Sequence, residues 1–145
     1  AASDVYKRQE FGFEIIEKGI SNASEISQAI DIVLGQADCI SNLTDNIVVN
    51  NLPVMLEKAN AVNIPIFGSE SKQVTGGCLA SAGVDYIELG KKAGIMASKI
   101  LKGEEISTIP YEVINQSEIA VNEETAANLN IVIPDDILKN AEKSN

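Results

Sequence analysis

The sequence contains no histidine, no tryptophan and only one arginine, Arg8. Without histidine, the chain cannot itself supply the imidazole of a catalytic triad or of a histidine general base. Its two cysteines, Cys39 and Cys78, are too few for a tetrahedral metal site without histidine, and they form no Cys-x-x-Cys pair. Both fall in predicted strands, where a free cysteine is usually a small buried apolar residue. We therefore expect no metal site, no cofactor and no enzymatic activity.

Positive charge is also scarce, with 11 lysine and arginine residues against 21 aspartate and glutamate residues. The net charge of −10 repels phosphate backbones and anionic headgroups, which argues against binding to nucleic acid or to a membrane surface. No apolar run reaches the ~18 residues that a membrane span requires. Neither a Walker-type phosphate loop nor a G-x-G-x-x-G motif occurs, which disfavours a flavodoxin-like enzyme.

The remaining composition is that of a globular chain of one domain's length, with 145 residues of which 45% are hydrophobic. Residues 1–9 differ from the rest, because they hold the only arginine and show no periodicity. We expect residues 1–9 to be a non-native, adapter-like segment that does not take part in the fold.

From Phe11 onward, strand and helix patterns alternate. Short apolar runs predict strands over 13–17, 38–42, 64–67 and 78–82, and weaker ones over 111–114 and 118–121. Helical spacing predicts helices over 23–34, 44–59, 86–102, 123–129 and 134–143, the last with Lys139 and Lys143 near its end. Alternation at intervals of roughly 25 residues is typical of βαβ units and a parallel sheet.

Local signals refine these helices. Asn22 with Glu25, and Asp85 with Glu88, read as capping boxes that start helices. Pro53 is expected to bend or split the helix over 44–59, and the polar stretch 71–77 is expected to be a connection. The helix over 86–102 has the clearest apolar stripe, which consists of Tyr86, Leu89, Ala93, Met96, Ala97, Ile100 and Leu101.

Three successive strands end in a polar group that contains a carboxylate. These groups are Thr44-Asp45-Asn46, Gly68-Ser69-Glu70 and Gly83-Val84-Asp85. Ligands of open parallel sheets bind outside the carboxyl ends of the strands, where helix N-termini also offer N–H groups to anions. Together they predict a polar cleft for a ligand that carries both a cation and a carboxylate, such as an α-amino acid.

Each carboxylate also has a purely structural interpretation. Asp45 and Asp85 are good N-caps, and Glu70 has the features of a solvated loop charge. Capping and ligand binding can coexist on one aspartate. The coincidence of the three groups at equivalent strand ends therefore carries more weight than any one of them.

Four segments, taken in order, resemble the tryptophan/tyrosine type of ABC-transporter substrate-binding protein. They are Thr44-Asp-Asn46, Ile64-Pro-Ile-Phe-Gly-Ser-Glu70, Gly83-Val-Asp-Tyr-Ile-Glu-Leu-Gly90 and Lys99-Ile-Leu-Lys-Gly-Glu104. Ile119-Ala-Val-Asn122 followed by Ala126-Ala127 is similar to a further segment of that family. Ile87 departs from the pattern, because a tyrosine is commoner there.

The resemblance implies an α/β fold, in which this chain is a fragment: a parallel-sheet lobe of the two-lobe type I periplasmic-binding-protein fold. Residues 10–84 would form the C-terminal ligand-binding lobe. Residues 85–110 would cross to a missing N-terminal lobe, and residues 111–145 would return.

The resemblance also implies a function, namely the solute-binding component of an ABC importer. Its partners would be a small ligand, for which we expect an amino acid such as an aromatic one, and the ABC permease subunits. The location would be extracytoplasmic, with any lipid anchor in the missing N-terminal part. Binding roles carry over to Thr44, Asp45, Asn46, Ser69, Glu70 and Asp85. The alternative is the effector domain of a transcriptional regulator with the same fold, which would need a helix-turn-helix upstream.

Overall fold

A computed structural model describes residues 10–113 and 117–143 of the chain, which forms two units, Ala1–Ile66 and Phe67–Asn145. The expectation for residues 1–9 falls outside the described residues and stays a prediction. Within the described ranges, every helix is too short or too polar to cross a membrane.

The first unit is built mainly from helices. Its elements are the 3-10 turn η1 (Ala23–Glu25), α2 (Ile26–Leu34), β1 (Ile40–Ser41), α3 (Asn46–Asn50) and α4 (Leu52–Ala61), and β1 pairs with β2 (Ile66–Phe67). The Asn22 side chain accepts the Ser24 N–H at 3.1 Å, and the Glu25 carboxylate accepts the Ser21 N–H at 2.8 Å. The predicted start of the first helix is therefore confirmed.

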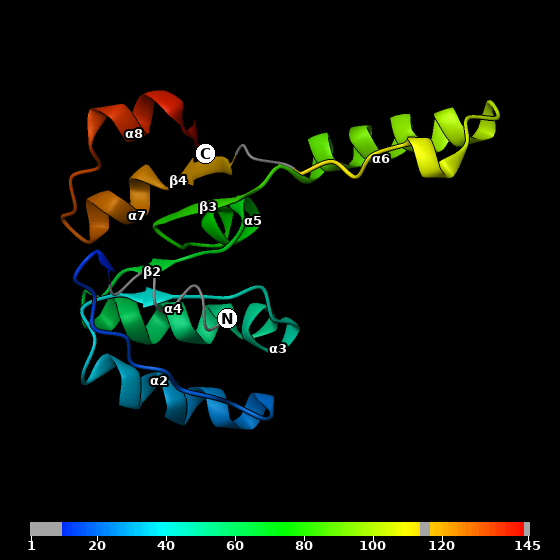
Figure 1. Cartoon of the computed structure of the whole chain (residues 1–145). Coiled ribbons are helices and arrows are strands. Elements are labelled where there is room, and N and C mark those ends of the chain that lie inside the picture. The colour runs from blue at the N-terminus through cyan, green and yellow to red at the C-terminus, as the bar shows by residue number, and fades with distance from the viewer. Residues whose placement is uncertain (1–9, 114–116, 144–145) are drawn as a thin grey trace. The chain divides into compact units, whose positions relative to one another are not determined.

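Helices α2 and α4 pack on each other in the first unit (Figure 1). Their buried residues are Ile26, Ala29 and Ile30 on α2, and Leu52, Met55, Leu56 and Ala59 on α4. At the edge of this contact, Lys58 Nζ lies 2.7 Å from Asp31 and donates to the Ser27 carbonyl at 3.0 Å. Because this ion pair is solvent-accessible, the apolar contact supplies most of the stability.

Pro53 splits the predicted helix over 44–59, as expected. It lies in the first turn of α4, where a missing N–H costs no helical hydrogen bond. Asn51 Nδ2 donates to the Ile47 carbonyl at 2.8 Å and thereby satisfies an acceptor near the end of α3.

The prediction of a strand over 13–17 is wrong. This segment has no regular secondary structure, and Phe13 is 57% exposed. An apolar run forms a strand only where a neighbouring strand receives its N–H and C=O groups, and no strand in the described part of the chain pairs with this run.

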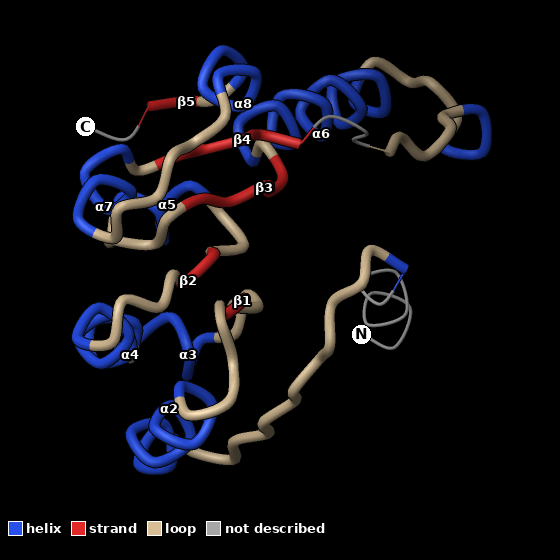
Figure 2. The backbone as a smooth tube through the Cα atoms, turned by 90° about the vertical axis from the view of Figure 1, so that its left-hand side faces the viewer, coloured by secondary structure: helices blue, strands red, loops and turns tan. Residues whose placement is uncertain are grey.

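The second unit contains a three-stranded sheet in the order β3-β4-β5 (Figure 2). Its elements are α5 (Ser71–Thr75), β3 (Ala80–Val84), α6 (Tyr86–Leu101), the 3-10 turn η2 (Ile106–Thr108), β4 (Ser117–Val121), α7 (Glu123–Asn128), α8 (Asp135–Asn140) and β5 (Glu142–Lys143). The buried apolar residues of these elements and their connections are Val74, Cys78, Leu79, Ala120, Val121 and Ala126. The polar connection over 71–77, where the sequence left a helix undecided, contains the short helix α5. One expectation is corrected: Lys143 lies in a strand instead of a helix.

The sheet combines both strand directions. Gly68 bridges Ser81 in the parallel sense and β4 pairs with β5 in parallel, whereas β3 and β4 are antiparallel, with Val84 opposite Ser117. The expected α/β fold with parallel strand pairing is present, but the expectation of parallel strands fails at β3 and β4. The chain leaves β3 along α6 and returns beside it, so β4 arrives from the opposite direction.

Helix α6 extends away from this sheet (Figure 1) and contains no buried residue. Its predicted bounds are confirmed, but Leu89 remains 43% exposed and Ile100 41% exposed. An ion pair of 3.4 Å between Lys92 and Glu112 joins it to the returning segment. Each large apolar side chain left in water forgoes about 1.5–3 kcal/mol that full burial would contribute.

We expect the chain, expressed on its own, to self-associate through the apolar stripe of α6. Exchange of Leu89 and Ile100 for glutamine, which is neutral and favours helices, is expected to shift the chain toward monomer in sedimentation experiments. Val132→Gln is the matched control, because Val132 is 90% exposed and lies outside α6. An equal shift with the control, or a monomeric unmodified chain, contradicts the prediction.

Candidate functional site

Two of the predicted strand ends lie side by side in the second unit. The Gly68 N–H donates to the Ala80 carbonyl at 2.9 Å, which aligns the end of β2 with β3. A Cβ atom on Gly83 would lie only 2.6 Å from the Ser69 carbonyl oxygen and 3.3 Å from the Glu70 Cα. The backbone of Ser69 and Glu70 therefore rests directly on β3, one residue before Val84 leads into Asp85.

Ser69 is held from its other side by Gln73, a residue of α5 that is only 2% exposed. The Ser69 N–H donates to Gln73 Oε1 at 3.2 Å, and Gln73 Nε2 donates to Ser69 Oγ at 3.1 Å. One buried amide thus engages both the backbone and the hydroxyl of Ser69.

Glu70 occupies the N-cap position of α5, but its side chain makes no capping hydrogen bond. Serine, threonine, aspartate and asparagine are the residues that usually cap a helix, because their short side chains reach back to the first N–H groups. The half-buried carboxylate of Glu70 is consequently not used by the helix that it precedes.

Asp85 caps α6 with one of its two carboxylate oxygens. Its Oδ1 accepts the N–H groups of Ile87 at 2.8 Å and Glu88 at 2.9 Å. The structural interpretation of Asp85 is therefore correct, and Oδ2 remains as an acceptor for a second group.

The other three predicted residues lie in the first unit, at the start of α3, and all three are exposed. Asp45 Oδ1 accepts the N–H groups of Ile47 at 2.8 Å and Val48 at 3.2 Å. Thr44 precedes this cap and Asn46 is the first residue of the helix. Asp45 repeats the arrangement of Asp85, with one oxygen on the helix and one remaining.

Among the described residues, none of the three candidate carboxylates takes part in an ion pair. The ion pairs that the structure describes, Lys58–Asp31 and Lys92–Glu112, use neither Asp45, Glu70 nor Asp85. Across residues 10–113 and 117–143, no cluster of three or more histidine, cysteine, aspartate or glutamate side chains is suited to a metal ion. Carboxylate oxygens of this kind can accept charge-assisted hydrogen bonds from a cation such as an ammonium group.

A family model described as ABC transporter substrate binding protein matches residues 5–145. The chain belongs to this family. The resemblance seen in the sequence is thereby confirmed, and the family is one of substrate-binding proteins.

Several proteins of known name or structure are similar to this chain. A tyrosine-binding protein of Clostridioides difficile (strain R20291) is 42% identical over 113 residues, which make up 78% of this chain and 33% of that protein. The ABC domain from Streptococcus pneumonia in complex with L-Trp has a TM-score of 0.80 at 26% identity, with 93% of this chain and 46% of that chain covered. A ligand-free, open substrate-binding protein with adhesive properties from Clostridium difficile has a TM-score of 0.77 at 34% identity, with coverages of 97% and 48%. The chain spans about a third of the curated relative and about half of each solved chain.

Two polar residues that hold elements of the second unit together, Gln73 and Asn122, were not among the predicted site residues. Gln73 was part of a stretch expected to be a simple connection. Asn122 donates from Nδ2 to the Val74 carbonyl at 3.0 Å and caps α7 through the Thr125 N–H at 2.8 Å. The available signals were a glutamine three residues after Glu70 and an asparagine directly before a helical run.

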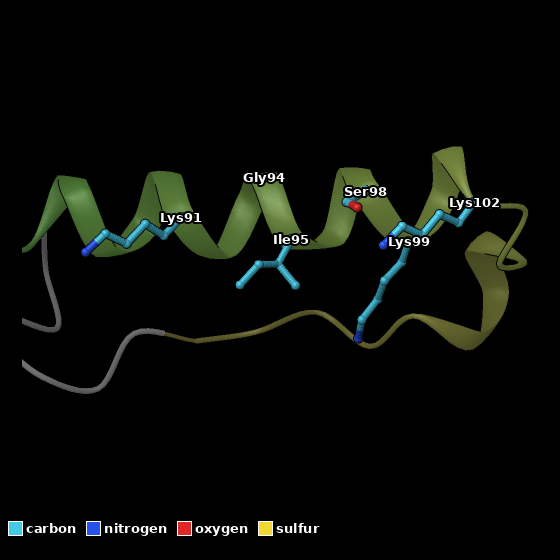
Figure 3. A pocket seen from close by; sticks show the side chains of 6 residues that line it. All are labelled: Lys91, Gly94, Ile95, Ser98, Lys99 and Lys102. Carbon is cyan, nitrogen blue, oxygen red and sulfur yellow. The ribbon is translucent and has the colours of Figure 1, made fainter.

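An open groove of about 620 Å³ lies along α6 and shares no residue with the candidate site (Figure 3). It is lined by Lys91, Gly94, Ile95, Ser98, Lys99 and Lys102. The side chains of Ile95 and Lys99 point toward the returning segment (Figure 3). The groove is a solvent-facing surface of the extended helix rather than an enclosed pocket.

The two cysteines differ in their surroundings. Cys78 is fully buried, and its burial raises the pKa of the thiol to about 12, whereas Cys39 is exposed. The expectation of burial is correct for Cys78 and wrong for Cys39. The expectation that both lie in strands is wrong, because β1 begins at Ile40 and β3 begins at Ala80.

We expect one fast-reacting thiol in the folded chain. At about pH 8 the Cys78 thiol stays protonated and shielded, so dithiobis(nitrobenzoate) is expected to modify Cys39 first and Cys78 only on unfolding. The Cys39→Ser variant is expected to lose the fast phase in absorbance measurements. A fast phase that persists in this variant contradicts the assignment.

Ser81 gives a second prediction, on stability. Its Oγ is buried and has no hydrogen-bond partner among the described residues. Burying an unpaired hydroxyl costs about 1–3 kcal/mol, so Ser81→Ala is expected to leave the free energy of unfolding unchanged or raise it. In urea titrations, Asn122→Ala is the contrasting variant and is expected to lose about 1–2 kcal/mol with its cap and its bond to Val74. A larger loss for Ser81→Ala than for Asn122→Ala contradicts this account.

Proposed function

We propose that the chain is part of the solute-binding component of an ABC importer, which captures an amino acid between two lobes and delivers it to a permease. The observation that carries this proposal is the position of the strand end Ser69-Glu70, which lies between the Gln73 side chain and the backbone of Gly83. The chain is also a member of the ABC transporter substrate binding protein family. A fixed backbone next to an uncommitted carboxylate is suited to selective binding of a small charged molecule.

In this proposal, different residues would bind the two ends of an amino acid. Glu70, together with the second oxygens of Asp45 and Asp85, would hold the ammonium group. Ser69, Thr44 and backbone N–H groups would hold the carboxylate, because the only arginine of the chain is Arg8. Asn46 would complete the polar lining.

Two relatives support an aromatic amino acid as the ligand. One is named as a tyrosine-binding protein, and one solved structure contains L-Trp. A description as a transporter's substrate-binding protein also favours transport over the effector domain of a transcriptional regulator.

The remaining parts of the proposal concern the complete protein. Residues 10–84 would belong to the C-terminal lobe, residues 85–110 would reach the other lobe and residues 111–145 would return. The protein would act outside the cytoplasm, held near the permease by a lipid anchor or within a periplasm. Lobe closure would trap the ligand without breaking or forming a covalent bond.

The test is amino-acid binding by the complete gene product, measured by calorimetry and thermal shift with L-tyrosine and L-tryptophan. Glu70→Gln is expected to weaken L-tyrosine binding at least about tenfold, since a charge-assisted hydrogen bond to the ammonium group is lost. The same variant is expected to change binding of the analogue that lacks the amino group much less.

Glu57→Gln is the matched control, because Glu57 is an exposed acid on α4 outside the candidate site and the charge change is the same. An equal effect of this control would assign the loss to net charge and remove Glu70 from the site. No stabilisation by any of the common amino acids would overturn the proposed ligand class.

A further inference from the structure

The side chain of Gln73 is almost completely buried, although an apolar residue would occupy a buried helix position at lower cost. A buried amide is retained where its hydrogen bonds are satisfied and where they hold something in place. In this chain both of its polar atoms are bonded to the same residue, Ser69.

The orientation of that amide follows from the groups that it meets. The Ser69 backbone N–H can only donate, so the oxygen of Gln73 must face it and the nitrogen must face the hydroxyl. Because Ser69 Oγ accepts from Gln73, the hydroxyl hydrogen is directed to an acceptor other than Gln73. Gln73 thereby excludes one direction for the Ser69 hydroxyl hydrogen.

Two glycines make this arrangement possible. A Cβ atom on Gly68 would lie 2.9 Å from the Gln73 Cβ and 3.1 Å from its Oε1, so any side chain there would push the amide away. On the opposite side of Ser69, a Cβ atom on Gly83 would collide with the Ser69 carbonyl oxygen. Ser69 thus lies between the Gln73 amide and strand β3. Both can lie this close because Gly68 and Gly83 have no side chains.

We propose that Gln73 is a positioning residue for the ligand site, which fixes the N–H and the hydroxyl of Ser69 so that Ser69 and Glu70 meet the ligand in one arrangement. Gln73 itself does not touch the ligand. This inference rests on the proposed function, in which Ser69 binds the ligand carboxylate.

The first test needs no ligand and uses the complete gene product. Gln73→Met keeps an unbranched side chain of similar length but removes both hydrogen bonds. The amide hydrogen of Ser69 is expected to exchange with solvent at least about tenfold faster in this variant, as followed by proton–nitrogen correlation spectra. Ser81→Ala is the matched control, because Ser81 is buried beside Gly68 but makes no bond to Ser69.

The second test is a double-mutant cycle on L-tyrosine affinity. Ser69→Ala and Gln73→Met are each expected to weaken binding about tenfold, and the double variant about as much as the stronger single one. A glutamine that served only the stability of the fold would give additive losses instead. Gly68→Ala is expected to reproduce the Gln73→Met result, and it replaces that variant should Gln73→Met fail to fold.

Unchanged amide exchange at Ser69, or additive losses in the cycle, overturns the positioning role. If none of the common amino acids binds the unmodified protein, the proposed function fails, and the exchange measurement still decides whether Gln73 holds Ser69.

Discussion

The second unit depends on one steric constraint: the backbone of Ser69 and the backbone of β3 approach too closely for a side chain to stand between them. The carbonyl oxygen of Ser69 lies 2.6 Å from the place where a Cβ of Gly83 would be. The hydrogen bond from Gly68 to Ala80, the start of α5 and the seating of Gln73 all follow from this approach. A dense backbone contact of this kind leaves the strand ends little freedom, so the proposed site would be arranged before a ligand arrives.

The capping aspartates serve folding in a way that is compatible with the binding role proposed for them. Asp45 and Asp85 each use a single oxygen for two N–H groups of a helix. Those bonds fix the carboxylate rotamer at no cost to the second oxygen. Glu70 makes no capping hydrogen bond, so helix capping explains the positions of the two aspartates but not that of Glu70.

Much of the fold could be predicted from the sequence, because helix starts, stripes and strand runs are local properties. Asn22, Pro53 and Asp85 each marked a boundary that the structure has. The segment around Phe13 and the direction of β4 could not be predicted, since pairing depends on which strands meet rather than on the run itself. The carboxylates of the candidate site could be found by their place after strands. The role of Gln73 could not be predicted in this way, because it depends on a close approach to Gly68 that only the absence of a side chain there allows.

The excursion along α6 leaves and rejoins the sheet at opposing residues, Val84 and Ser117. Between these points the described chain contributes no buried side chain to the core of the second unit. Opening of this arm would break its own helical hydrogen bonds but leave the antiparallel ladder of β3 and β4 intact. Local and global unfolding are therefore energetically separate in this unit, and the arm belongs to its least protected part. The region with the largest exposed apolar stripe is also the one that the core needs least for its own stability.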